Sequence, residues 1–246
     1  MPHRMLTLDE VAEYLHLTPE DVVRLLKTAD MPHTMRGEHP IFLRGDVDEW
    51  ASRRIMGLPD RRLSAFHDQT MPQVRRIREE DALMPELIRT DYINLELPSR
   101  TKSSVLRDMV DFAAGTGRVF DPKSLLESIQ IREELCSTAL PGGAALLHAR
   151  HHEEYQYEGS FLMLGRTIAT IPFGASDGGH TRLFFLICCG DDRLHLHTLA
   201  RLCLMVQKTD LLAQLWRAED ADSAIAILGE CEQTALLGKK HTAGTD

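Results

Sequence analysis

Two histidines stand where ligand chemistry is expected in an α/β protein. His148 follows Ala144–Leu147, a short apolar run after Gly142-Gly143 that is typical of a buried strand. Ligand chemistry in such folds gathers just outside strand ends. A neutral imidazole nitrogen is a good nucleophile near pH 7, because unperturbed histidine titrates at about pH 6.5. The sequence therefore indicates His148 as a candidate nucleophile.

The second histidine, His195, lies where a helix is predicted to begin. The segment Asp191-Asp192-Arg193-Leu194-His195 follows the apolar strand pattern Leu183–Cys189. His195 is then expected in the first helical turn, near unpaired N–H groups at the positive end of the helix dipole. Helix N-termini of this kind bind phosphate readily. His197, two residues on, is expected to point to a different side.

A metal site is the alternative use of these side chains. The histidines available to it are His148, His151, His152, His180 and His195. Their spacings match no common ligand set. The pair His151-His152, followed by two glutamates, is more typical of a solvated loop. The five cysteines, an odd number without C-x-x-C spacing, indicate buried reduced thiols and neither a disulfide framework nor a zinc site.

Alternating helical and strand patterns between residues 85 and 236 must position these histidines. Helices are expected over 101–114, from Asp121-Pro122 to Arg132-Glu133, over 193–207 and 210–217, and from about 222. Strands are expected over 144–147, 160–164, 166–171 and 183–189. This alternation predicts an α/β domain with a mixed sheet flanked by helices, followed by a flexible tail over 237–246.

The motifs around the two histidines resemble the enzyme IIA domain of the phosphotransferase system, of the fructose, mannitol and nitrogen-regulatory type. The family pattern "R-E-x-x-x-S-T … G-x-A-x-P-H-A-R" corresponds here to "REELCSTALPGGAALLHAR". Its apolar strand, acidic turn and "H-L-x-x-L-A" correspond to "LFFLICCGDDRLHLHTLARL". The resemblance covers roughly residues 85–230.

This resemblance implies a role for three side chains. His148 is the expected phosphoryl acceptor, His195 the second active-site histidine, and Arg132 the arginine that neutralises phosphoryl oxygens. The phosphoryl donor is expected to be an HPr-like phosphocarrier protein, and no metal, nucleotide or other cofactor is required. Transfer from a protein carrier requires an imidazole that the carrier can reach at the mouth of the sheet. The sequence departs from the family at Leu147, which replaces a proline, and at Ala139-Leu140-Pro141.

Residues 1–57 predict a small winged helix-turn-helix domain. Thr7 and Glu10 form a capping box for a first helix, and Thr18-Pro19 begins a second. Arg36-Gly37-Glu38 is typical of a turn between two short strands, and a third helix starts at about Asp46. The stretch "LTLDEVAEYLHLTPEDVVRLLKTADMPHTMRGEHPIFLRGDVDEW" resembles the excisionase family of DNA-binding domains.

The resemblance implies that the second helix enters the major groove of DNA and that the wing contacts the backbone. The candidate contact residues are Arg24, Lys27, Arg36 and Arg44. Glu20 and Asp21 occupy the first turn of this helix, where they favour the helix N-terminus but repel DNA phosphates. A protein-interaction module on the same fold is therefore the alternative for this domain.

Residues 58–84 are expected to form a polar linker. Its arginines are Arg61, Arg62, Arg75, Arg76 and Arg78. An auxiliary contact with DNA or a coiled dimer contact is the alternative for this segment. The net charge of −9 argues against indiscriminate nucleic-acid binding, because that binding depends on neutralising phosphates. No apolar run approaches the roughly 20 residues of a membrane helix, so a cytoplasmic protein without a membrane partner is expected.

Together these features predict a phosphorylation-responsive regulator of the phosphotransferase system, which couples phosphoryl transfer to His148 with binding of DNA or of a partner. One alternative is a non-catalytic DNA-binding regulator whose second domain serves only for homodimerisation or docking. A second alternative is a sugar-transport enzyme IIA that passes the phosphoryl group to a separate IIB protein.

Overall fold

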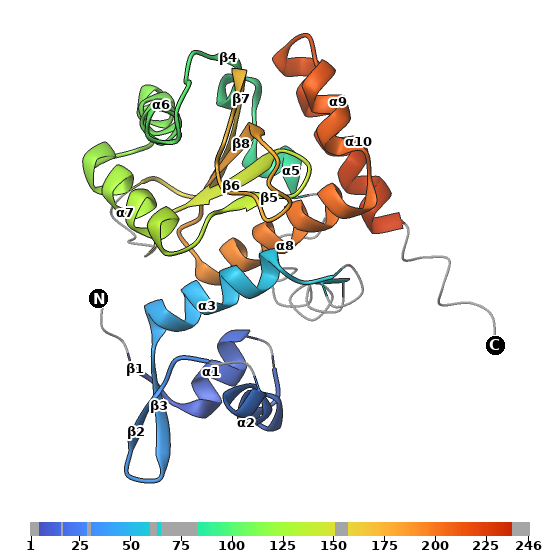
Figure 1. Ribbon diagram of the computed structural model, residues 1–246. Coiled ribbons are helices and arrows are strands. Elements are labelled where there is room, and N and C mark those ends of the chain that lie inside the picture. Colours follow the sequence, from blue (N-terminus) through green and yellow to red (C-terminus); the bar gives the residue numbers. More distant parts are fainter. Residues whose placement is uncertain are drawn as a thin grey trace, which may run out of the picture.

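A computed structural model of the chain describes residues 5–15, 17–28, 31–59, 63–64, 83–150 and 157–237. Several sequence predictions concern residues outside these ranges: the linker arginines, His151-His152 and nearly all of the tail. The described residues form a small N-terminal unit and a larger α/β unit (Figure 1). The α/β class with a mixed sheet and a small helix-turn-helix unit is confirmed.

The N-terminal unit contains three helices and a three-stranded antiparallel sheet in the order β1-β3-β2. Its elements are β1 (Met5–Leu6), α1 (Leu8–Leu15), α2 (Pro19–Thr28), β2 (Thr34–Arg36), β3 (His39–Leu43) and α3 (Arg44–Met56). Local signals fix the first two helices. The Thr7 backbone N–H donates to Glu10 Oε2 at 2.8 Å and the Glu10 N–H donates to Thr7 Oγ1 at 3.3 Å, which is the expected capping box. The Asp21 N–H donates to Thr18 Oγ1 at 3.2 Å.

The larger unit is built on a five-stranded mixed sheet in the order β4-β7-β8-β6-β5. Its strands are β4 (Ile93–Leu97), β5 (Ala139–Leu140), β6 (Ala144–His148), β7 (Phe161–Ile171) and β8 (Thr181–Cys188). β6 and β8 are parallel and almost wholly buried, as a central pair covered on both faces should be. The tight turn between β5 and β6 uses two glycines with positive φ, Gly142 and Gly143.

Helices cover this sheet and close its ends (Figure 1). They are α5 (Met84–Leu87), α6 (Lys102–Gly115), α7 (Pro122–Leu135), α8 (Asp192–Lys208), α9 (Leu211–Arg217) and α10 (Ala221–Leu237), with a 3-10 turn η1 (Thr90–Tyr92) before β4. Figure 1 shows α6 and α7 on one side of the strands and α9 and α10 on the other. Helices α6 and α7 are capped at their N-termini, because Thr101 and Asp121 each accept a hydrogen bond from the backbone N–H three residues on.

One strand prediction differs from the structure. The sequence suggests two strands separated at Gly165, whereas β7 runs through this residue without a break. A Cβ atom at Gly165 would overlap Leu97 and Met109, so the glycine allows β4 and α6 to pack directly against the strand. The glycine is thus a site of close approach within one strand.

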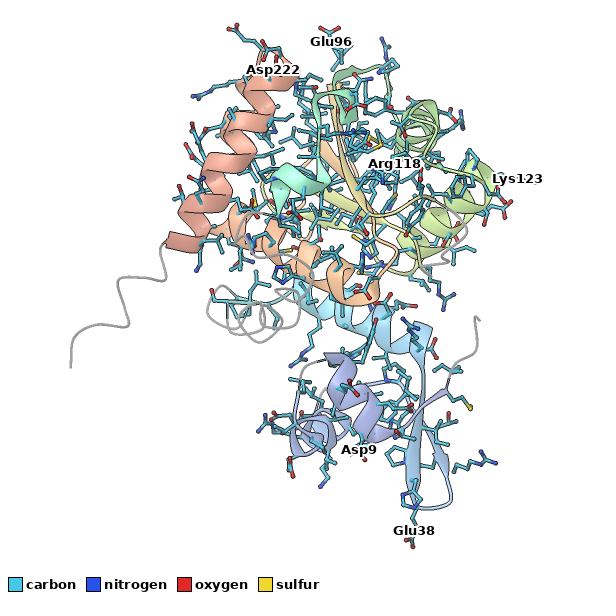
Figure 2. The ribbon with its side chains drawn as sticks, turned by 180° about the vertical axis from the view of Figure 1, so that it is seen from behind. Asp9, Glu38, Glu96, Arg118, Lys123 and Asp222 are labelled. Atoms are coloured by element: carbon cyan, nitrogen blue, oxygen red, sulfur yellow. The ribbon has the colours of Figure 1, made fainter. Side chains whose placement is uncertain are left out.

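The two units are in contact through α3, which lies along α8 (Figure 1). The buried residues of α3 include Asp48, Ser52 and Ile55. Polar contacts between the units include Glu49 Oε2, which lies 3.4 Å from Arg150 Nη2, and Gln207 Nε2, which donates to the Leu58 carbonyl at 3.2 Å. The β2–β3 hairpin points away from the larger unit, with Glu38 at its tip (Figure 2).

Candidate functional site

His148 is the last residue of β6, in register with Ile187 of the parallel strand β8. Its Nδ1 lies 2.8 Å from the carbonyl oxygen of Leu146. Since a carbonyl can only accept, Nδ1 carries the proton and Nε2 carries the lone pair. This assignment of the tautomer follows from the hydrogen bonds. The nitrogen that remains nucleophilic is therefore Nε2.

Arg132, in the last turn of α7, contacts that nitrogen directly. Its Nε donates to His148 Nε2 at 3.0 Å, and its Nη1 donates to the Cys136 carbonyl at 2.9 Å. Among the described residues, Nη2 has no hydrogen-bond partner, although the side chain is 1% exposed. A buried guanidinium with an unused donor beside a nucleophilic nitrogen is suited to bind an anion placed there.

Burial lowers the pKa of the Arg132 guanidinium. The negative charges of Glu133 and Glu49 oppose this shift, and the positive charge of Arg53 adds to it. Glu49 and Arg53 belong to α3, so charges of the N-terminal unit act on the cation of the site. Arginine keeps its proton despite such shifts, because its ordinary pKa is above about 12.

His195 lies in the first turn of α8, as the sequence predicts. Its ring centroid is 5.0 Å from that of His148, with 51° between the ring planes. The helix is capped by the Asp191 side chain, which accepts from the Leu194 N–H at 2.9 Å. His197 turns elsewhere: its Nε2 lies 3.4 Å from Nη2 of Arg201. Three predicted site residues, His148, Arg132 and His195, therefore converge.

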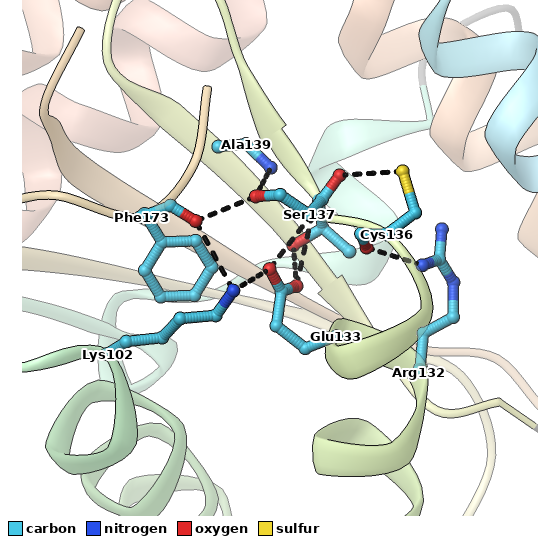
Figure 3. A network of polar contacts seen from close by, with 8 residues as sticks. Lys102, Arg132, Glu133, Cys136, Ser137, Ala139 and Phe173 are labelled. Carbon is cyan, nitrogen blue, oxygen red and sulfur yellow. Dashed lines mark hydrogen bonds and ion pairs between the residues drawn. The ribbon is translucent and has the colours of Figure 1, made fainter. Parts of the chain in front are cut away.

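A network of polar contacts fixes the chain just beyond Arg132 (Figure 3). The buried Glu133 carboxylate accepts from the Thr138 backbone N–H at 3.1 Å and from Thr138 Oγ1 at 2.6 Å. Lys102 Nζ lies 2.8 Å from Glu133 Oε1 and donates to the Phe173 carbonyl at 3.3 Å. Ser137 Oγ donates to the same carbonyl at 2.8 Å. These contacts hold the end of α7 that presents Arg132.

The site is closed in this structure. His148, Arg132 and His195 are 2%, 1% and 0% exposed. The expectation of an imidazole that a carrier can reach at the mouth of the sheet is therefore wrong for this arrangement of the two units. Helix α3 lies next to this region, because its Glu49 is ion-paired with Arg150, two residues after His148.

Sequence reasoning missed Arg150 and Glu49 as parts of the site. Arg150 ends the motif around His148, and this position was the only signal for it. Its Nε is buried and has no hydrogen-bond partner among the described residues. Glu49 gave no signal, because the contact joins two units that are far apart in the sequence.

The two departures from the family pattern lie on β6 and on the neighbouring strand β5. Leu147 is a buried residue of β6, paired with Leu186 in β8. Ala139 and Leu140 form β5, which pairs antiparallel with Ala145 and Ala144 of β6. The segment that replaces the expected loop therefore adds an edge strand beside the strand that carries His148.

The four candidate DNA contacts differ in their surroundings. Lys27 and Arg36 are exposed, on α2 and on the hairpin, and neither forms an ion pair with the residues that the structure describes. Arg24 is ion-paired with Asp21 one turn earlier. The guanidinium of Arg44 lies 5.8 Å from the centroid of the Tyr14 ring, at the start of α3.

The described residues bear on two further possibilities, a metal site and a membrane-spanning helix. No group of three or more histidine, cysteine, aspartate or glutamate side chains within them is placed to hold a metal ion. No helix among them has the length and apolar character needed to span a bilayer.

Comparison with known proteins places this geometry in context. Residues 86–231 match the family described as phosphoenolpyruvate-dependent sugar phosphotransferase system, EIIA 2, and residues 5–55 match one described as helix-turn-helix domain. The fructose-specific EIIABC component from Bacillus subtilis is 29% identical over 147 residues, which are 59% of this chain and 23% of that protein. The fructose-specific EIIA component from Haloferax volcanii is 28% identical over 144 residues, which are 57% of this chain and 90% of that protein.

The fold is also similar to that of a solved IIA protein. The crystal structure of nitrogen regulatory protein IIA-Ntr from Neisseria meningitidis has a TM-score of 0.54 at 23% identity, and the match covers 60% of this chain and 99% of that one. The matches thus cover 90% of the Haloferax volcanii protein and 99% of the Neisseria meningitidis protein, but only 23% of the Bacillus subtilis protein.

Proposed function

Since the chain belongs to the phosphoenolpyruvate-dependent sugar phosphotransferase system EIIA 2 family, we propose that Nε2 of His148 accepts a phosphoryl group from an HPr-like phosphocarrier. The observation that carries this proposal is the pair of contacts on His148. Its Nδ1 proton is held by the Leu146 carbonyl, and its Nε2 faces the Arg132 guanidinium.

In the proposed reaction, Nε2 attacks the phosphorus of the carrier's phosphohistidine in line. The new N–P bond forms as the old one breaks, and the carrier's imidazole leaves with the bonding electron pair. The Nδ1 proton of His148 stays in its hydrogen bond with Leu146. Arg132 moves its donors from the imidazole to the phosphoryl oxygens, which its unused Nη2 already favours. Positioning and charge stabilisation supply most of the catalysis in such transfers.

His195 would complete the phosphoryl site. Its ring lies beside that of His148, in the first turn of a helix whose positive end favours a bound anion. We propose that it donates a hydrogen bond to a phosphoryl oxygen. This role is the expected one for the second histidine of the motif.

We further propose that the N-terminal unit binds DNA and that the chain is a cytoplasmic regulator. The helix-turn-helix match supports this, and α2 and the hairpin with Lys27 and Arg36 lie on the side of the unit away from the α3–α8 contact (Figure 1). A separate IIB or regulatory protein is the proposed downstream acceptor. The domain boundaries, 1–57 and 85–236, are part of this proposal.

Intact-mass measurement after incubation with phosphorylated carrier tests the transfer. The wild-type chain and the His180→Ala control, which alters an exposed histidine, should each gain one phosphoryl group. The His148→Ala variant should gain none. Equal labelling of His148→Ala and wild type would reject the proposed acceptor, and the absence of any labelling in either chain would favour a second domain that serves only for docking or dimerisation.

A further inference from the structure

Helix α3 of the N-terminal unit places a carboxylate at the arginines of the candidate site. Glu49 Oε2 lies 3.4 Å from Arg150 Nη2, and the Glu49 side chain is 11% exposed. Glu49 Oε1 also lies 3.7 Å from Arg53 Nη2 on the same helix. The charge of Glu49 also acts on Arg132, where it opposes the effect of burial on the pKa of the guanidinium. One carboxylate from the first unit is therefore ion-paired with Arg150 of the second and favours the charged form of Arg132.

Both arginines retain donors suited to a larger anion. Arg132 Nη2 and Arg150 Nε are buried and have no hydrogen-bond partner among the described residues. A phosphoryl group offers three acceptor oxygens and about two negative charges, whereas a carboxylate offers two oxygens and one charge. Glu49 therefore occupies a cationic site that it satisfies only in part.

We propose that Glu49 is an intramolecular competitor for the phosphoryl site: docked α3 covers the surface that the phosphocarrier needs, and phosphorylation of His148 releases α3 from α8. This inference rests on the proposed function. Arg150 becomes a second phosphoryl-binding arginine, which is paired with Glu49 in the unphosphorylated chain.

Replacement of Glu49 by the phosphoryl group depends on charge and on access to the site. His148 and Arg132 are at most 2% exposed in the docked arrangement, and in this proposal a protein donor gains access when the units separate. After transfer, a phosphoryl group beside Glu49 repels this carboxylate and takes over its arginine partners. Redocking would bring the Glu49 carboxylate toward the phosphoryl charge.

The consequence for the N-terminal unit is a change of position. The hairpin extends away from α8 (Figures 1 and 2), so its surface is accessible in the docked arrangement. Release of α3 frees the unit to reorient relative to the second unit. Phosphorylation then controls how the DNA-binding surface is presented.

The variant Glu49→Gln tests the competition, with Glu38→Gln as a matched control at the hairpin tip (Figure 2). The initial rate of labelling by phosphorylated carrier is measured on the full chain. Glu49→Gln should be labelled about tenfold faster than wild type, because a partly buried ion pair that favours the closed arrangement is lost. Glu38→Gln should match wild type.

Hydrogen–deuterium exchange of α3 supplies the second readout. Amides of Arg44–Met56 should exchange faster after phosphorylation of His148, and faster in unphosphorylated Glu49→Gln than in Glu38→Gln. If His148 is labelled while α3 exchange stays unchanged and Glu49→Gln shows no rate gain, the inference is overturned and the proposed function stands. If neither wild type nor Glu49→Gln is labelled, the proposed function fails, and this inference fails with it.

Discussion

The two nitrogens of His148 have different partners, and this difference decides which of them can bond to phosphorus. Nδ1 is held by the Leu146 carbonyl within the same strand, while Nε2 meets the guanidinium of Arg132. Strand and helix thus each fix one side of the ring. Such fixed geometry matters because catalysis of phosphoryl transfer relies largely on positioning.

Arg132→Lys should slow phosphoryl transfer about 10²- to 10³-fold, the range found when one oxyanion donor is removed. Lysine keeps a positive charge, but it lacks the planar fork that bonds His148, the Cys136 carbonyl and a phosphoryl oxygen together. The rate is measured by rapid-quench labelling with phosphorylated carrier. Arg107→Lys, at an exposed position of α6, is the control and should leave the rate unchanged. Equal rates for both variants would show that Arg132 contributes charge alone.

The cysteines should differ sharply in reactivity. Burial raises the pKa of the Cys189 and Cys203 thiols to about 12, and it also raises the pKa values of Cys188 and Cys231. Only the thiolate reacts with disulfide reagents. At pH 8 the folded chain should therefore react rapidly at one thiol, the exposed Cys136, and at all five after denaturation. Rapid reaction of two or more thiols in the folded chain would contradict this assignment.

The raised pKa values of the buried thiols also affect the stability of the fold at alkaline pH. A thiol whose pKa is raised by folding stays protonated in the native chain, while the unfolded chain releases its proton above about pH 8.5. The free energy of unfolding should therefore fall as the pH rises through this value.

At the scale of elements, buried polar anchors fix how the helices meet the sheet. Glu232 of α10 forms a buried ion pair with Arg201 of α8, with Oε1 and Nη1 2.5 Å apart. The same carboxylate accepts from the backbone N–H groups of Leu83 and Met84 at 2.9 and 3.0 Å. One side chain thus joins α10, α8 and the start of α5.

Glu232→Ala should lower the free energy of unfolding by about 3–5 kcal/mol, because it leaves Arg201 buried without its counter-charge. Urea denaturation followed by circular dichroism measures the change. Glu230→Ala, on the exposed side of the same helix, should cost less than about 0.5 kcal/mol. A loss below about 1 kcal/mol for Glu232→Ala would mean that the pair contributes little to the fold.

Local patterns in the sequence predicted most helices and the position of the site. Capping residues such as Thr7, Thr18 and Thr101 act within one turn, so their effect is visible in the sequence. The strands β4 and β5 were missed, because they are short and gain their stability from pairing. The unbroken course of β7 at Gly165 depends on close contact with α6, which no local pattern reveals.

The main residues of the candidate site were predicted from the sequence, but its contact with α3 was not. The motif residues His148, Arg132 and His195 converge, as the resemblance to the enzyme IIA family implied. The contact with α3 depends on Glu49 and Arg150, about a hundred positions apart, whose residue types are common on any protein surface.

At the scale of the whole molecule, the surface that would bind DNA and the site that would bind phosphate lie on different sides of one short helix. α2 and the hairpin extend from the side opposite the α3–α8 contact (Figure 1). In the proposed account, the signal between them passes through the position of α3. The proposed coupling between phosphorylation and DNA binding therefore depends on the α3–α8 interface.

Lys27→Ala and Arg36→Ala should each weaken DNA binding and lower the slope of log K against log salt by about 1, as expected when one phosphate contact is lost. Binding is measured by fluorescence anisotropy on a duplex selected from a random pool by the intact chain. Lys123→Ala, on the larger unit, is the control (Figure 2). Unchanged salt slopes for both head variants would favour a protein-interaction role for this unit.

The most direct test of the central claim is phosphorus-31 NMR of the intact chain after incubation with phosphorylated carrier. The account predicts a single phosphohistidine resonance of the Nε2 isomer, absent from His148→Ala, because Nδ1 is occupied by the Leu146 carbonyl. An Nδ1 isomer, or no phosphohistidine in either wild type or Glu49→Gln, would contradict it.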